Sequence, residues 1–243
     1  MGLYNNIIRT VVLTAAVFFT VNTAKAQLFR GAVSAGAVIS QLDGDEVYGF
    51  KHVGFTGGLG VMMPFNPEKA DDGFQLSLEL LFTQRGAKNS NIYDPFWYKA
   101  DLNYIDIPLM VHYMDKRAGV ALGVGLQYGR LIKTTERWKL WDTMILDMCR
   151  PVVTNNHSFD KNDLSFVADF RFNVWKKLKF DVRWQYSLIP IRKDFEYFNS
   201  FSETALEYKH WTRDFKSNYV TFKFIYVINE PDDNASKYSK RRR

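Results

Sequence analysis

Residues 178–189 read LKFDVRWQYSLI, in which large apolar side chains alternate with polar ones. The apolar positions are Leu178, Phe180, Val182, Trp184, Tyr186 and Leu188. Lys179, Asp181 and Arg183 occupy the positions between them. A period of two places alternate side chains on opposite faces of a β-strand. This stretch therefore predicts a strand with one apolar face and one charged face.

The same alternation recurs along the chain and predicts eight strands. They cover about residues 29–40, 53–63, 74–85, 103–114, 119–131, 164–174, 178–189 and 218–228. Each segment is close to the ~9–11 residues that a tilted strand needs to cross a bilayer. This length is compatible with strands that cross a membrane.

Charge sorts between the two faces, because no charged residue interrupts the run of apolar residues that defines the apolar face of each segment. The opposite face holds Arg30, Glu79, Asp106, Asp169, Arg171, Lys179, Asp181, Arg183 and Lys223. A soluble barrel would bury its apolar face and expose its charges. The large aromatic face here is better suited to lipid, with the charges inside. We expect an all-β fold, an eight-stranded antiparallel transmembrane β-barrel; the alternative is a soluble sandwich with one solvated face.

The connections between these segments alternate in length. The longer ones are residues 41–52, 86–102, 132–163 and 190–217, and the shorter ones are 64–73, 115–118 and 175–177. Bacterial outer-membrane barrels have short periplasmic turns and long outer loops. This pattern predicts that both ends of the barrel lie on the periplasmic side.

The first 26 residues have the features of a secretory signal peptide. Arg9 precedes an apolar stretch at residues 11–21, and Ala24-Lys25-Ala26 forms a small-residue cleavage site. The apolar stretch is too short to be a transmembrane helix. We expect residues 1–26 to be removed, 27–228 to form the barrel in an outer membrane, and 229–243 to form a flexible basic tail.

Composition excludes several other classes. The 243 residues are 47% hydrophobic and 16% aromatic, with a net charge of +6 and one cysteine, Cys149, which cannot pair within the chain. Export excludes a nucleic-acid partner.

The four histidines lack metal-ligand spacing, and no nucleophile, base and orienting group can be identified together. We therefore predict no metal, no cofactor and no enzymatic activity.

The inward charges predict a structural network. Five cations and four anions on the inner face would form buried ion pairs that plug the lumen. Glycines on neighbouring inner faces, including Gly119, Gly123 and Gly125, would make room for them. Pro108 would face inward and require a bulge or kink beside Asp106.

Several segments resemble the PorT-like family of outer-membrane β-barrels. Tyr104-Ile105-Asp106-Ile107-Pro108-Leu109 is similar to that family's fourth-strand motif, Y-[IL]-[DE]-[IFV]-P-L. Residues 79–87, 119–129 and 183–187 are similar to its third, fifth and seventh strands. The resemblance implies an eight-stranded outer-membrane barrel connected with type IX protein secretion, with outer-membrane lipid and other secretion-system proteins as partners.

Two other functions stay open: an adhesive or structural surface barrel that binds an outside partner through its loops, and a small lipid-modifying enzyme. One loop segment suits partner contact, because Trp138, Trp141, Ile145 and Met148 recur at helical spacing within residues 136–150. We expect these aromatics to pack at the base of the loop or in the interfacial girdle; the alternative is a short amphipathic helix that caps the barrel or contacts a partner.

Overall fold

The computed structural model describes residues 29–45, 49–66, 72–88, 96–140, 158–199 and 209–229. Within these ranges the strands are β1 (Arg30–Asp43), β2 (His52–Pro64), β3 (Gly73–Lys88), β4 (Phe96–Asp115), β5 (Val120–Leu140), β6 (Asn162–Asn173), β7 (Leu178–Ser187), β8 (Arg192–Asn199) and β9 (Lys209–Val227). The predicted signal peptide lies outside the described residues, as does all of the predicted tail except Asn229. No helix in the described part of the chain is long and apolar enough to cross a membrane.

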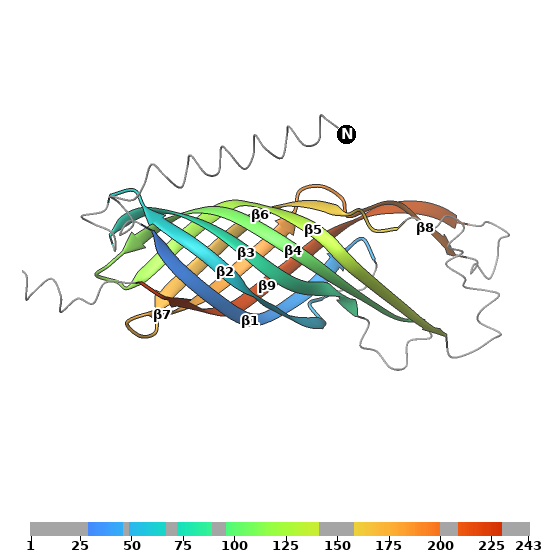
Figure 1. The fold of residues 1–243 in the computed structure, drawn as a ribbon. Coiled ribbons are helices and arrows are strands. Elements are labelled where there is room, and N and C mark those ends of the chain that lie inside the picture. The colour runs from blue at the N-terminus through green and yellow to red at the C-terminus, as the bar shows by residue number, and fades with distance from the viewer. Residues whose placement is uncertain are drawn as a thin grey trace, which may run out of the picture.

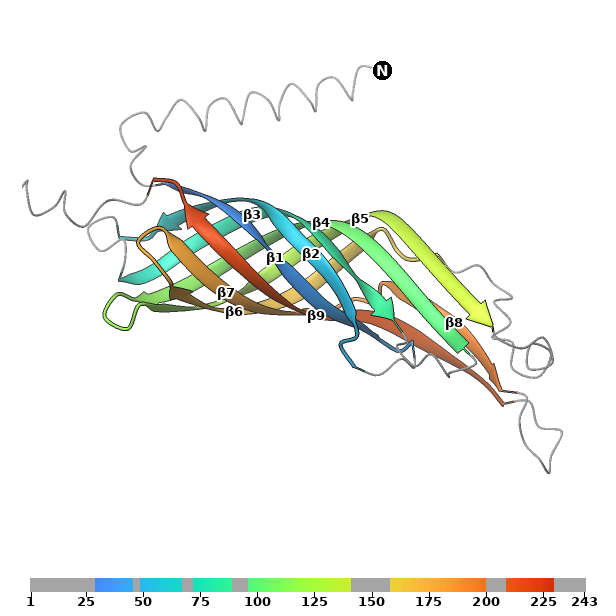
Figure 2. The ribbon, with the colours of Figure 1, turned by 90° about the horizontal axis from the view of Figure 1, so that it is seen from below.

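Eight of these strands close into a ring. Each neighbour in the order β1-β2-β3-β4-β5-β6-β7-β9 is hydrogen-bonded to the next, and β9 pairs back onto β1 from Ala32↔Val227 to Asp43↔Lys216. Every pairing is antiparallel. The predicted all-β, eight-stranded antiparallel barrel is confirmed (Figures 1 and 2).

The apolar and charged faces lie as the alternation predicts. Leu122, Val124 and Leu126 on β5 are 61%, 55% and 51% exposed on the outside of the barrel. The inward residues beside them, Ala121 and Gln127, are buried. All nine charged residues assigned to the inner face are buried: Arg30, Glu79, Asp106, Asp169, Arg171, Lys179, Asp181, Arg183 and Lys223. An outer surface this apolar requires lipid rather than water around it.

The structure corrects the strand boundaries at one end of the barrel. β4 begins at Phe96, β5 continues to Leu140 and β9 begins at Lys209, well outside the predicted segments. The unpredicted β8 lies in the 190–217 connection and pairs with the first part of β9. These additions, β4 96–103, β5 132–140, β8 and β9 209–215, form the outer extension, which runs past the barrel in Figures 1 and 2.

The extension contradicts the first part of the alternative helix at 136–150. Residues 136–140 continue β5, and Trp138 pairs with Tyr98 of β4. Backbone pairing satisfies the N–H and C=O groups of both strands there. Trp141, Ile145, Met148 and Cys149 lie outside the described residues.

The connections at the opposite end are residues 65–72, 116–119 and 174–177, of which 67–71 lie outside the described residues. Asp115 closes the second, because its Oδ1 accepts hydrogen bonds from the backbone N–H of Arg117 and Ala118, and Gly119 has a φ of 68°. Gly119 is therefore a turn residue and not part of the inner face. The first outer connection, 44–51, is no longer than the 65–72 connection, because β1 and β2 extend into the predicted loop.

Pro108 faces inward as predicted, but the irregularity lies elsewhere. On the β4–β5 side, the register shifts between Asn103 and Tyr104, and Pro108 pairs in register with Gln127. On the β3 side, the pairing passes from Leu78↔Leu109 to Leu81↔Asp106 and leaves out the pair opposite Pro108. A gap in the ladder accommodates the missing N–H of proline.

Candidate functional site

The side chains in the lumen form layers along the barrel. The inward residues of β9 belong to successive layers, from Val227 at the turn end to Phe215 at the outer end. Val227 and Ile225 belong to an apolar cluster with Ala32 and Met62 at the turn end. Lys223 joins a network of ion pairs, and Tyr219 joins a second polar cluster. Phe215 belongs to an apolar cluster at the outer end. The polar groups are therefore closed off at both ends by apolar side chains.

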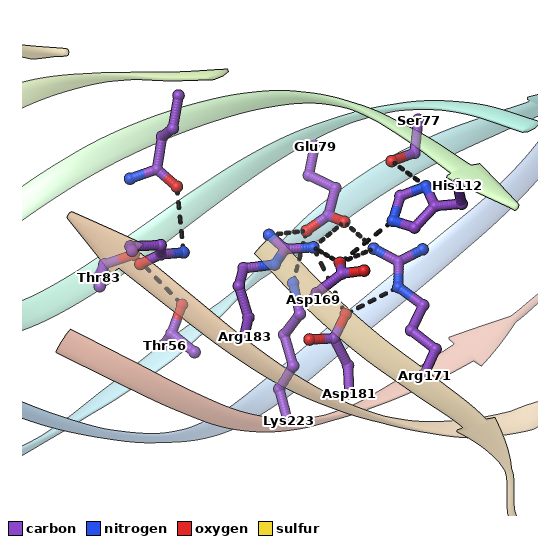
Figure 3. A network of polar contacts seen from close by, with 12 residues as sticks. Thr56, Ser77, Glu79, Thr83, His112, Asp169, Arg171, Asp181, Arg183 and Lys223 are labelled. Carbon is purple, nitrogen blue, oxygen red and sulfur yellow. Dashed lines mark hydrogen bonds and ion pairs between the residues drawn. The ribbon is translucent and has the colours of Figure 1, made fainter. Parts of the chain in front are cut away.

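The ion pairs in the middle of the lumen centre on Glu79 of β3. Arg183 of β7 donates to its carboxylate from Nη1 and Nη2, at 3.0 and 2.7 Å. Lys223 of β9 donates to Oε2 at 2.6 Å, and Arg171 of β6 donates to Oε1 at 2.9 Å. Figure 3 shows these side chains converging from four strands.

Two further carboxylates complete this network. Asp169 Oδ2 accepts from Arg171 and Arg183 at 3.0 and 3.1 Å. Asp181 Oδ2 accepts from Arg171 Nε at 2.8 Å. We call Glu79, His112, Asp169, Arg171, Asp181, Arg183 and Lys223 the central network. Its three carboxylates balance its two guanidiniums and one ammonium, which a buried set of charges requires.

His112 of β4 connects the central network to Ser77 of β3. Its Nε2 lies 3.1 Å from Asp169 Oδ2, and its Nδ1 lies 3.4 Å from Ser77 Oγ. The carboxylate fixes the tautomer with the proton on Nε2, so that the serine hydroxyl donates to Nδ1. Gly123 of β5 leaves room for the side chains of His112 and Asp169, because a Cβ at this position would lie 2.3 Å from both Asp169 Oδ1 and His112 Cδ2.

A second polar cluster surrounds Arg85, nearer the outer end. Its guanidinium carbon lies 3.7 Å from the ring centroid of Tyr104 and 4.9 Å from that of Tyr219. Arg85 Nη2 is 2.8 Å from Asp163 Oδ2 and 3.8 Å from Asp106 Oδ1. We call these five residues the Arg85 cluster. A cation between aromatic faces and carboxylates is stabilised by both.

Tyr104 and Asp106, from the segment that resembles the PorT-like motif, therefore build the Arg85 cluster. Asp106 Oδ2 accepts a hydrogen bond from Tyr219 Oη at 3.3 Å. Gly129 provides the space, because a Cβ there would lie 2.6 Å from Asp106 Oδ1 and 3.1 Å from Arg85 Nη2. Of the other motif residues, Pro108 faces the lumen and Leu109 is 50% exposed on the outer face.

The nine charges assigned to one lumen network thus separate into groups. Glu79, Asp169, Arg171, Asp181, Arg183 and Lys223 meet in the central network. Asp106 belongs to the Arg85 cluster. Arg30 and Lys179 are buried near the turn end.

A third polar group ties four strands together at the outer end. Ser40 Oγ of β1 donates to Gly86 O and accepts from Gly86 N, both at 2.9 Å, and lies 3.1 Å from His52 Nδ1. His52 Nε2 lies 2.8 Å from Asp101 Oδ1, and Lys99 Nζ is 2.9 Å from Asp101 Oδ2. Asp101 lies in the outer extension, outside the membrane-spanning part of β4. Burial would raise the pKa of its carboxyl, but hydrogen bonds from His52 and Lys99 outweigh burial and lower this pKa.

Ser77–His112–Asp169 and Ser40–His52–Asp101 each contain the residue types of a catalytic triad. Ser77 and His112 are 1% and 0% exposed, and Ser40 is 0% exposed with its hydroxyl bonded to the Gly86 backbone. A nucleophilic serine must reach its substrate, so this burial suits a structural role. In the described residues no group of three or more His, Cys, Asp and Glu side chains could hold a metal ion.

The outer end of the lumen is closed by an apolar cap. It comprises Leu42, Ala87, Ala100, Leu102, Tyr104, Phe159, Ile191 and Phe215. Arg192 covers this cap, with its guanidinium carbon 4.4 Å from the ring centroid of Phe159. Arg192 also donates from Nη1 and Nη2 to the two oxygens of Glu136, at 2.9 and 3.2 Å, and so ties β8 to β5.

Sequence reasoning missed Arg85, Asp163 and Tyr219. Arg85 has the same parity as Glu79 on β3, and Asp163 the same parity as Asp169 on β6. Arg85 lies at an inner-face position of the predicted segment 74–85, and extending the segment 164–174 by one residue would have placed Asp163 inside as well.

A closed antiparallel ring with a lipid-suited outer face and a charged interior defines a membrane β-barrel. The family model described as "Outer membrane protein beta-barrel domain" matches residues 11–209. The chain belongs to this family and is an outer-membrane β-barrel protein. A search of the curated proteins finds no match.

Solved structures of outer-membrane barrels are similar in fold. The attachment invasion locus protein Ail of Yersinia pestis is 14% identical, with 82% of this chain and 99% of that chain covered and a TM-score of 0.41. Neisserial surface protein A is 11% identical, covering 82% and 97%, with a TM-score of 0.43. The Escherichia coli outer membrane protease OmpT is 10% identical, covering 83% and 94%, with a TM-score of 0.33.

Proposed function

We propose that this protein is a non-enzymatic outer-membrane barrel of the PorT-like type that acts as a component or assembly factor of type IX protein secretion. The main support for this proposal is the structural role of Tyr104 and Asp106, two residues of the segment that resembles the PorT-like motif. Tyr104 and Asp106 contact the buried Arg85 and Tyr219, so residues that resemble the motif build a structural cluster in the lumen. The closed lumen supports a role in contacting other proteins rather than in passing solutes.

The outer extension provides a surface for such contacts. β4, β5, β8 and β9 continue beyond the apolar band, and exposed charged residues such as Lys133, Lys193 and Arg213 lie on this part. The same surface supports the second candidate, a barrel that binds a partner outside the cell. The two candidates differ in whether secretion depends on the protein.

The test is a gene deletion with complementation. We expect the deletion strain to lose secreted peptidase activity and the wild-type gene to restore it. A charge-reversed allele, Lys193→Glu with Arg213→Glu, should restore barrel levels in the outer membrane but not secretion. The matched control is Arg117→Glu, a reversal in the turn at the other end, which should restore both.

Normal secretion in the deletion strain would remove the type IX role and leave the surface-binding candidate. A change in the mass of lipid A on deletion, with secretion intact, would favour the lipid-modifying enzyme instead. A pull-down from intact outer membranes, compared between the wild type and the charge-reversed allele, would identify the partner of the extension.

A further inference from the structure

A group of polar side chains ends the apolar band on the outer wall of β5 and β6. The lipid-facing positions of β5 run through Leu122, Val124 and Leu126 to Tyr128, and Arg130 follows. Arg130 lies ten residues after the start of β5 at Val120. At about 3.4 Å per residue and a tilt of about 45°, that distance spans the ~25 Å apolar band. Arg130 is therefore at the depth of the outer lipid headgroups.

Asn162 of β6 holds Arg130 in place. Arg130 Nη1 donates to Asn162 Oδ1 at 2.6 Å, and Tyr128 Oη donates to the same oxygen at 2.7 Å. All three side chains are exposed. The amide oxygen fixes the guanidinium beside the tyrosine but uses only part of its donor capacity, because a guanidinium has five N–H donors.

The charge around Arg130 is positive. Lys161 is exposed next to Asn162, and its backbone C=O accepts from Leu131 N at 2.8 Å, which places it beside β5. In the part of the chain that the structure describes, neither cation forms an ion pair with a carboxylate. Asp163 faces inward to Arg85, and Asp160 pairs with neither cation. By contrast, Lys99 and Arg192 on the outer extension are each paired with an acid.

We propose that Arg130, Lys161, Asn162 and Tyr128 form a binding site for the phosphate group of a glycolipid in the outer leaflet. A guanidinium fixed in position binds phosphate through two parallel hydrogen bonds, and the ammonium of Lys161 adds a second charge. The site faces sideways from the barrel wall at headgroup depth, so a lipid reaches it directly. The proposal requires the outer-membrane location but not the role in secretion.

The test is a lipid titration of the full-length protein purified in a non-ionic detergent, read by native mass spectrometry. The probes are bis-phosphorylated lipid A and the same lipid after enzymatic removal of its phosphates. We expect the wild type to bind the phosphorylated lipid at least about fivefold more tightly, a factor that corresponds to ~1 kcal/mol. Arg130→Gln should abolish this preference, and Arg130→Lys should retain part of it.

The matched control is Arg117→Gln, which makes the same charge change at an exposed position on the opposite rim. It should leave the preference within about twofold of the wild type. An unchanged preference in Arg130→Gln would overturn the proposal, and so would an equal loss in Arg117→Gln, since net charge alone would then explain it. Competition by inorganic phosphate at millimolar concentration would also overturn it, because the ligand would then be a free anion.

Discussion

Arg183 and Glu79 face each other across the lumen and join strands on opposite sides of the barrel. β3 and β7 are four strands apart in the ring of eight. The guanidinium contacts both carboxylate oxygens, with Nη1–Oε2 at 3.0 Å and Nη2–Oε1 at 2.7 Å. Because the geometry is bidentate and both groups are buried, the pair fixes the distance between the two walls.

Arg183→Met should destabilise the barrel by about 3–5 kcal/mol, because Glu79 and Asp181 would lose a buried partner. Urea unfolding of the protein in lipid vesicles, followed by tryptophan fluorescence, measures this. Arg117→Met in the exposed turn serves as the control and should change the free energy of unfolding by less than about 0.5 kcal/mol. If Arg183→Met lowered the free energy of unfolding by less than about 1 kcal/mol, the pair would not be what holds the two walls together.

The double variant Glu79→Leu with Arg183→Met should be more stable than the sum of the two single losses predicts. It removes one charge of each sign, so the network keeps two cations, Arg171 and Lys223, and two anions, Asp169 and Asp181. The same urea titration gives the coupling energy. Simple additivity would mean that the two side chains act independently.

Gly123→Ala should destabilise the barrel by about 1–3 kcal/mol, because its Cβ would overlap Asp169 and His112. Gly31→Ala is the matched control, since a Cβ there meets only Ile228 Cδ1, at 3.8 Å. Thermal unfolding on semi-native gels would rank the two. Equal melting temperatures would contradict the close packing around the central network.

The layered lumen predicts a barrel that does not conduct. In planar bilayers the wild type should give no large, steady single-channel current, and neither should Arg183→Met. The reason is that the apolar clusters at both ends remain when the central network is weakened. A steady current from the wild-type protein would contradict the plug.

The pair of Arg192 and Glu136 should hold the outer extension together. Arg192→Ala removes the tie between β8 and β5, so limited proteolysis of whole cells should cut the extension faster than in the wild type. Lys193→Ala, at the exposed neighbouring position, is the control. Identical digestion rates for the two variants would show that the pair is not needed.

The alternation of residues predicts the fold wherever one face meets lipid and the other is enclosed. It fails in the outer extension, which lies beyond the apolar band, where no lipid-facing side imposes an alternation. There the sequence at 136–150 suggested a helix as an alternative, although residues 136–140 belong to β5.

The candidate site could be predicted only in part for a similar reason. The inward direction of Glu79 and Lys223 follows from their parity on each strand. Their contact does not, because it joins residues 144 positions apart and depends on how the ring closes. The separation of Asp106 from the central network is likewise set by the register between strands.

The central claim is that the apolar outer face of the barrel contacts lipid, and Val124→Arg tests it most directly. Val124 is 55% exposed within the apolar band of β5. Folding into phosphatidylcholine vesicles, measured by urea titration, should lose about 2–4 kcal/mol, whereas Thr212→Arg in the outer extension should be neutral. If Val124→Arg folds as stably as the wild type, or if the mature protein is monomeric and folded in water without detergent, the account is contradicted.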